Sequence, residues 1–127
     1  MNASYVFRVR FRLDPPNATV DPDSFETVLR IPAEPPGADG WLFFQRTLWR
    51  GNVADDDHMQ RVASDRLGVT VESISFSELA TDEPYLAALK TEIERDLDRF
   101  NADSVEEVLH QHFGSSIHVR DDEFETP

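Results

Sequence analysis

Alternating apolar and polar residues near the N-terminus predict a β-strand with one buried face. In residues 5–13 every second side chain is apolar, and Arg8, Arg10 and Arg12 share the opposite face. This alternation is typical of antiparallel sheets, which keep one face against the core and the other against water.

Residues 21–31 allow two structures. Thr27, Leu29 and Ile31 alternate as in a strand, whereas a short helix opening at Asp21-Pro22 also fits the apolar spacing. The surrounding residues 14–40 contain six of the eight prolines, so this region cannot be regular throughout.

The most aromatic stretch is residues 41–51, WLFFQRTLWRG, which holds both tryptophans. It predicts a strand that is covered on both faces in its first half and emerges toward water in its second half. Trp49 should continue the buried face of Trp41. Arg50 should point the other way, with Arg46, and bridge to the aspartates at 55–57.

The second half of the chain predicts three helices and two strands. Helices are expected at 55–67, 83–100 and 105–113, from apolar stripes at helical spacing and from capping residues at their ends. Residues 69–76 predict a strand whose apolar phase slips, which a bulge or two-sided burial would explain. Residues 116–119 predict a short strand.

These elements favour an α+β fold, a two-layer sandwich. It would have a mainly antiparallel sheet of four to five strands, with about three helices packed on one face. We expect residues 1–119 to form a single domain and residues 120–127 to form an acidic disordered tail.

Charge adds an expectation about the environment. The net charge is −13, and only Lys90 among the twelve basic residues is a lysine. Such a surface suits molar salt, where the Debye length is only ~3 Å and carboxylates hardly repel one another. The chain has no cysteine, no apolar run of membrane-spanning length and no signal-peptide pattern at its N-terminus. We therefore expect a cytoplasmic protein that does not enter a membrane.

The sequence nominates no catalytic residue, cofactor or metal site. The run at 55–58, DDDH, lacks the later ligands of a calcium loop and reads better as a helix cap. His110 and His112 would point to different sides of a helix, so they cannot chelate one ion. There is no nucleophile elbow and no phosphate-binding glycine loop.

The arginines are the candidate binding residues. Arg8, Arg10 and Arg12 on one strand face could bind the phosphates of a single-stranded nucleic acid, with aromatic rings against the bases. The competing interpretation is that they pair with the protein's own carboxylates, since a net charge of −13 repels a polyanion.

Leu48-Trp49-Arg50, in a short, acidic, lysine-poor chain, resembles the haloarchaeal LWR-salt proteins, a family named for that tripeptide. The resemblance extends over essentially the full length, including WLFF before the tripeptide and GSSIHV at 114–119. It implies a halophilic, cytoplasmic protein and carries over no activity and no functional residue.

The function remains a hypothesis with three alternatives. The first is a small non-enzymatic interaction domain that binds a protein partner or a second copy of itself. The second is a nucleic-acid-binding module, and the third is an enzyme acting on a small anionic substrate. The binding residues expected across these alternatives are Trp49, Arg50, Arg46, Arg8, Arg10 and Arg12.

Overall fold

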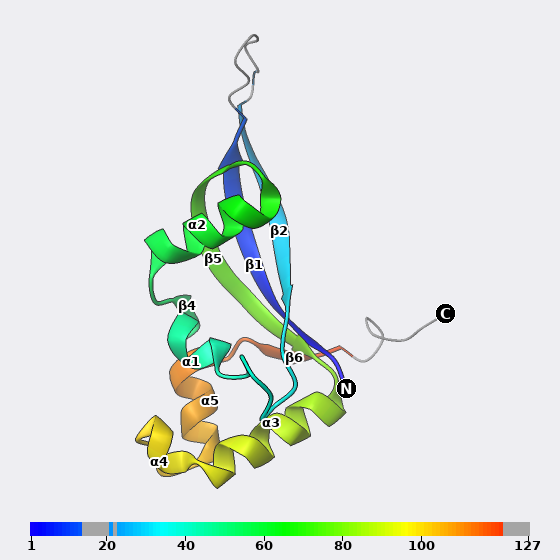
Figure 1. Cartoon of the computed structure of the whole chain (residues 1–127), viewed down its shortest axis with the longest axis vertical. Coiled ribbons are helices and arrows are strands. Elements are labelled where there is room, and N and C mark those ends of the chain that lie inside the picture. The colour runs from blue at the N-terminus through cyan, green and yellow to red at the C-terminus, as the bar shows by residue number, and fades with distance from the viewer. Residues whose placement is uncertain (14–20, 22, 121–127) are drawn as a thin grey trace, which may run out of the picture.

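A mixed four-stranded sheet forms one layer of the fold in the computed structural model, which describes residues 1–13, 21 and 23–120 (Figure 1). Its strands lie in the order β2-β1-β5-β6. β1 (Ala3–Arg12), β2 (Ser24–Pro32) and β5 (Thr70–Thr81) pair antiparallel, and β6 (Ile117–Val119) joins β5 in parallel. The expected mainly antiparallel sheet is confirmed, and residues 24–32 are a strand.

Two irregularities in β5 explain the slip in its apolar pattern. The register with β1 shifts at Val6/Phe7 and again at Arg10/Phe11. Each shift places two β5 residues where β1 has one, as a bulge does. As a result Val71, Ile74, Phe76 and Leu79 all sit opposite the buried face of β1, despite their uneven spacing.

Capping residues position the longer helices as their sequences predict. α2 (Asp56–Leu67) begins after Asp55, whose carboxylate accepts from His58 N–H, and ends at Gly68 in the left-handed conformation. α3 (Glu83–Arg95) is capped by Asp82. α5 (Val105–Phe113) is capped by Ser104.

The helix expected over residues 83–100 is divided in two. Asp96, with φ −140° and ψ 40°, leaves the helical conformation between α3 and the short α4 (Leu97–Phe100). The Asp96 N–H bonds to Ile93 O, three residues back instead of four. The apolar stripe nevertheless continues across the break, because Phe100 is buried like Leu89 and Ile93.

The core lies between the sheet and the helices. The buried residues of β1, β5 and β2 form one cluster with Met59 and Ala63 of α2, Leu89 of α3 and Phe113 of α5. In Figure 1, α2 lies across the upper part of the strands, whereas α5 and α3 lie toward their lower end. The α+β, two-layer arrangement is therefore confirmed.

The expected strand over residues 41–51 is wrong. Phe43–Thr47 form a short helix, α1, followed by a hairpin of two-residue strands, β3 (Leu48–Trp49) and β4 (Asn52–Val53). Phe44, Thr47 and Leu48 are buried at helical spacing, three and four residues apart. The Phe44 ring packs on Phe100 of α4 and Phe113 of α5, and the hairpin strands form a sheet separate from the main one.

Arg120 is the first residue of the tail expected over residues 120–127, and it makes two hydrogen bonds to β5. The Arg120 N–H donates to Thr81 O at 2.7 Å, and its Nε donates to Glu78 at 3.0 Å. This residue is therefore bound to the sheet edge. Residues 121–127, on which the rest of that expectation falls, lie outside the described residues.

Candidate binding surface at the 48–53 hairpin

The hairpin formed by Leu48–Val53, called the 48–53 hairpin below, turns through Arg50 and Gly51. Both turn residues have positive φ, 53° for Arg50 and 80° for Gly51. Two positive-φ residues between paired strands make a type I′ turn, which suits the twist of a hairpin but favours asparagine or glycine. Arginine at the first of these positions carries its side chain in a disfavoured backbone conformation.

This turn packs backbone to backbone against the end of α5. The Arg50 and Gly51 N–H groups donate to the carbonyls of Gln111 and His112. These carbonyls belong to the last turn of α5, where helical partners are missing. The hairpin thus caps the helix with two successive amides.

Glycine is required on both sides of this contact. A Cβ on Gly51 would lie 3.1 Å from Phe113 O, and one on Gly114 would lie 3.3 Å from Arg50 O. Both residues also have positive φ. The close approach of the two backbones therefore depends on Gly51 and Gly114.

His112 binds the first strand of the hairpin through a hydrogen bond from its ring. Its buried ring places Nδ1 2.9 Å from Leu48 O, and since a carbonyl only accepts, Nδ1 carries the proton. The ring also lies edge-on to Phe44 at 5.4 Å and to Trp49 at 5.7 Å between centroids. His112 thus links the first strand of the hairpin to the aromatic core.

Trp49 lies on the surface, contrary to its expected place in the core. It is 47% exposed, and its ring packs edge-on with His112. The Arg50 guanidinium carbon lies 5.7 Å from the Trp49 ring centroid, within cation–π range. The bridge expected between Arg50 and the aspartates at 55–57 is absent from the described ion pairs.

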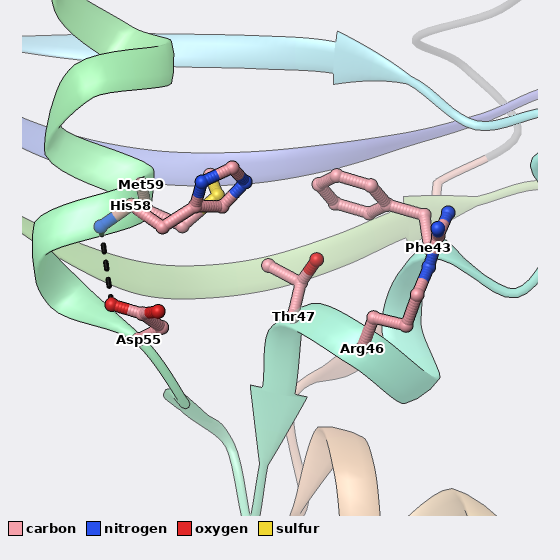
Figure 2. A pocket seen from close by; sticks show the side chains of 6 residues that line it. All are labelled: Phe43, Arg46, Thr47, Asp55, His58 and Met59. Carbon is pink, nitrogen blue, oxygen red and sulfur yellow. Dashed lines mark hydrogen bonds between the residues drawn. The ribbon is translucent and has the colours of Figure 1, made fainter.

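Arg46 lies apart from this pair, at a cleft between α1 and the start of α2 (Figure 2). The cleft has a volume of about 200 Å³. Its lining residues, all labelled in Figure 2, are Phe43, Arg46, Thr47, Asp55, His58 and Met59.

This cleft combines a cation with apolar walls, yet it is a poor substrate pocket. Arg46 makes no ion pair within the described part of the chain, so its guanidinium is available to a small anion. The Asp55 carboxylate lines the same cleft, and its negative charge would repel an anion bound there. The volume also falls below the ~300–1,000 Å³ of typical ligand pockets.

Arg8, Arg10 and Arg12 lie on the helix-free side of the sheet, which we call the arginine face. All three are exposed, and Arg12 contacts Glu72 at 3.6 Å. Their cross-strand neighbours on this face are Val28, Glu26 and Ser24 of β2 and serines or threonine of β5, with no aromatic side chain among them. The arginine face is open, but it lacks the stacking rings that single-stranded nucleic acid uses.

The titratable groups with altered pKa values have structural explanations. Burial alone would raise the pKa of Glu78, but hydrogen bonds from Arg120 and His118 outweigh it and hold the pKa below its usual range. Burial, with nearby Glu34, raises the pKa of Tyr85 to about 12. Burial likewise raises the pKa of Tyr5. Neither tyrosine is poised to exchange a proton near neutral pH.

Sequence reasoning missed the residues that hold the hairpin. It named Trp49 and Arg50, but not His112 and Gly114 as their supports. Gly51 and Gly114 were visible only as element ends, and their contact joins segments some sixty residues apart. A contact between segments so far apart cannot be predicted from a local sequence pattern.

Neither a metal cluster nor a spanning helix occurs in the part of the chain that the structure describes. No three histidine, aspartate or glutamate side chains there are grouped to hold an ion. None of its helices has the length and apolar character needed to cross a membrane.

Comparison with known proteins identifies a family and nothing closer. No curated protein and no solved structure matches the chain. The family described as the LWR-salt protein matches residues 1–123, which is nearly the whole sequence and includes the Leu48-Trp49-Arg50 tripeptide. The chain therefore belongs to the LWR-salt protein family.

Proposed function

We propose that this protein is a small, non-enzymatic interaction domain whose contact point for a protein partner is Trp49 with Arg50 beside it. The observation that supports this is a half-exposed tryptophan held in place from two sides, by His112 beneath the ring and Arg50 against it. Tryptophan and arginine are the residue types that most often dominate interface energies. A ring that is already ordered loses less freedom on binding.

We also propose that the domain works in the cytoplasm of a salt-adapted organism. Its charge of −13 and single lysine support this environment. In molar salt, ion pairs and phosphate contacts are screened, whereas contacts between apolar rings persist. An aromatic contact point therefore suits such conditions better than a charged one.

Trp49→Ala and Trp41→Ala test the contact point as a matched pair. We expect Trp49→Ala to lose a captured partner in high salt while costing clearly less than the ~3–5 kcal/mol of a buried aromatic. Trp41, packed on Phe44 and Phe100, should show the reverse, lower stability with capture retained by the folded fraction. Capture that survives Trp49→Ala unchanged would refute the proposed contact point.

Nucleic acid stays the alternative partner, because the arginine face is open and Arg8 and Arg10 form no ion pair within the described residues. Capture from nuclease-treated and untreated lysates separates the two proposals. Loss of the partner after nuclease treatment, together with sensitivity to Arg8→Ala, would favour the nucleic-acid alternative.

Dialysis tests the proposed environment. On transfer from molar KCl to dilute, divalent-free buffer, far-UV circular dichroism should report cooperative unfolding, because unscreened carboxylates repel one another. A full helical and strand signal in dilute buffer would show that the acidic surface serves another purpose.

A further inference from the structure

The strand β2 forms an edge of the main sheet, and no other strand of the described chain pairs with its outer side. Two bonds fix which backbone groups lie on that side. Leu13 N–H donates to Asp23 O, and Ala33 N–H donates to Ala3 O. The odd-numbered residues of β2 therefore direct their backbone N–H and C=O groups toward β1. The even-numbered residues therefore direct their N–H and C=O groups outward, and they are Ser24, Glu26, Val28, Arg30 and Pro32, the proline with its C=O alone.

This edge is weakly protected against pairing with another strand. Proteins usually guard such edges with lysine, proline, a bulge or a covering segment. β2 contains no lysine, its one proline, Pro32, lies at the end of the strand, and its two charged residues, Glu26 and Arg30, have opposite signs. Val28, at its centre, is 52% exposed.

The charges around Val28 are arranged with opposite signs at equal distances. Glu26 precedes it by two residues and Arg30 follows it by two, and all three side chains share the face that carries Arg8 and Arg10. Glu26 has no ion-pair partner in the described part of its own chain. Arg30 does interact within the chain, so a cross-strand pair would add to its existing contacts.

We propose that β2 pairs antiparallel with β2 of a second copy, about a two-fold axis at Val28. In this register Val28 lies opposite Val28 of the other copy, and each Glu26 lies opposite an Arg30. The outward backbone groups of Val28, Glu26 and Arg30 then meet as hydrogen-bonded pairs, as the parity of the edge requires. This interface is separate from the surface around Trp49.

Charge favours this register over those centred on Glu26 or Arg30, and among the two-fold axes along β2 only the one at Val28 places glutamate opposite arginine. A two-fold axis at Glu26 would place two glutamates opposite each other, and an axis at Arg30 would place two arginines opposite each other. Like charges directly opposite one another destabilise a strand pair, whereas opposite charges stabilise it. The axis at Val28 replaces both repulsions with two equivalent attractions, as a self-complementary interface needs.

The consequence is a continuous eight-stranded sheet built from two copies. An axis perpendicular to the sheet leaves the helices of both copies on one side and both arginine faces on the other. Backbone bonds and the Val28 contact hold such a pair in molar salt, where the Debye length is only ~3 Å and the charges mainly decide register.

Single cysteines test the register directly, because the chain has none of its own. Opposed hydrogen-bonded residues have Cα atoms about 5.5 Å apart, within disulfide range. Val28→Cys should therefore form a covalent dimer under mild oxidation in high salt. Glu26→Cys, exposed on the same face but roughly 13 Å from its symmetry mate in this register, is the matched control and should stay monomeric.

Charge exchange tests the interface in the cysteine-free protein by sedimentation equilibrium, at the lowest salt that preserves the circular dichroism signal. Glu26→Arg should weaken dimerisation roughly tenfold, since two opposed pairs become repulsive. The double variant Glu26→Arg with Arg30→Glu should restore it. Glu94→Arg, an equal charge change on the exposed side of α3, should leave it unchanged.

Three results would overturn the proposal. One is a monomer at all accessible concentrations. A second is equal crosslinking of the two cysteine variants, which would indicate random collision. The third is a dimer that Trp49→Ala abolishes while Glu26→Arg does not, which would place the contact at the 48–53 hairpin.

Discussion

The main sheet and the 48–53 hairpin are stabilised in different ways. In β1, buried side chains provide the stabilising contacts, because Phe7 and Val9 are fully buried and define the core face. In the hairpin only Leu48 is fully buried, and backbone groups make the main contacts with α5. A sheet residue is thus replaceable by one of similar size, whereas a turn residue is constrained by what its backbone must do.

The largest expected effect concerns a side chain of the sheet. Phe7→Ala removes a ring that packs edge-on against Phe76 at 5.7 Å, and should cost ~3–5 kcal/mol of unfolding free energy. Denaturant titration in high salt measures this cost.

The same titration tests whether the two regions unfold together. Phe113 contacts Tyr5 and Phe76 of the sheet as well as Phe44 beside the hairpin, so tryptophan fluorescence and circular dichroism should report one transition. An earlier fluorescence transition would show that the hairpin is a separate cooperative unit.

The second effect concerns the hairpin backbone. Gly51→Ala meets Phe113 O as well as a positive φ, and should cost ~2–3 kcal/mol. Gly68→Ala at the end of α2 has a similar φ of 70° but nothing within 4 Å of the added carbon, and should cost only ~1 kcal/mol. The difference between the two melts isolates the crowding at α5. Equal costs would mean that the backbones can move apart freely.

These two regions also show what the sequence can reveal. The strict alternation of β1, the caps Asp55 and Ser104 and the Gly68 helix end are local patterns, and the structure confirms each of them. The phase slip in β5 allowed either a bulge or burial on both faces, and the register shifts show the bulge. Such features follow from periodicity and from the few residue types that can cap the free backbone groups at a helix end.

The residues around Trp49 illustrate the opposite case. Their aromatic content suggested a strand, but the helical spacing of Phe44, Thr47 and Leu48 was the better guide. The position of Trp49 depends on His112, and the bond from His112 to Leu48 spans 64 residues. Tertiary contact therefore decides the candidate surface, and strand propensity alone misplaces it.

A smaller effect is expected from acid at the end of the sheet. Asp82 follows β5 and accepts from Tyr85 N–H at 2.9 Å and Asn2 N–H at 2.8 Å. Burial alone would raise its pKa, but these bonds and the N-terminal ammonium outweigh it and lower the pKa below the usual aspartate value. The stabilisation is present above the unfolded-state pKa and disappears as pH falls through the lower folded-state value.

Asp82→Asn tests this acid dependence by difference. The variant should be less stable at neutral pH by about 1 kcal/mol, as for a weakened helix cap, and should lose less stability than the parent on acidification below pH ~4. Denaturant melts of both proteins from pH 7 to pH 2.5, at constant salt, measure the two curves. Parallel curves would mean that Asp82 titrates alike in the folded and unfolded chains.

The smallest effect tests why an arginine occupies the turn. Arg50→Asn supplies the residue that type I′ turns favour, relieving a positive φ that costs other residues ~1–2 kcal/mol. It also removes the contact with Trp49, worth ~0.5–1 kcal/mol at an exposed site. The net change in unfolding free energy should be close to zero or slightly stabilising, measured by melts in high salt.

The same variant should bind the protein partner more weakly, because the guanidinium no longer lies beside the exposed ring. Unchanged or improved stability with weaker binding would mean that Arg50 is kept for contact at the expense of the turn. Arg50→Lys retains both charge and backbone strain but loses the planar group, so it separates stacking from charge. If Arg50→Asn instead destabilises the fold by more than ~1 kcal/mol, its contact with Trp49 outweighs the strain of the turn. In that case the pair is a structural clamp, and the hairpin side chains contribute to stability much as those of the sheet do.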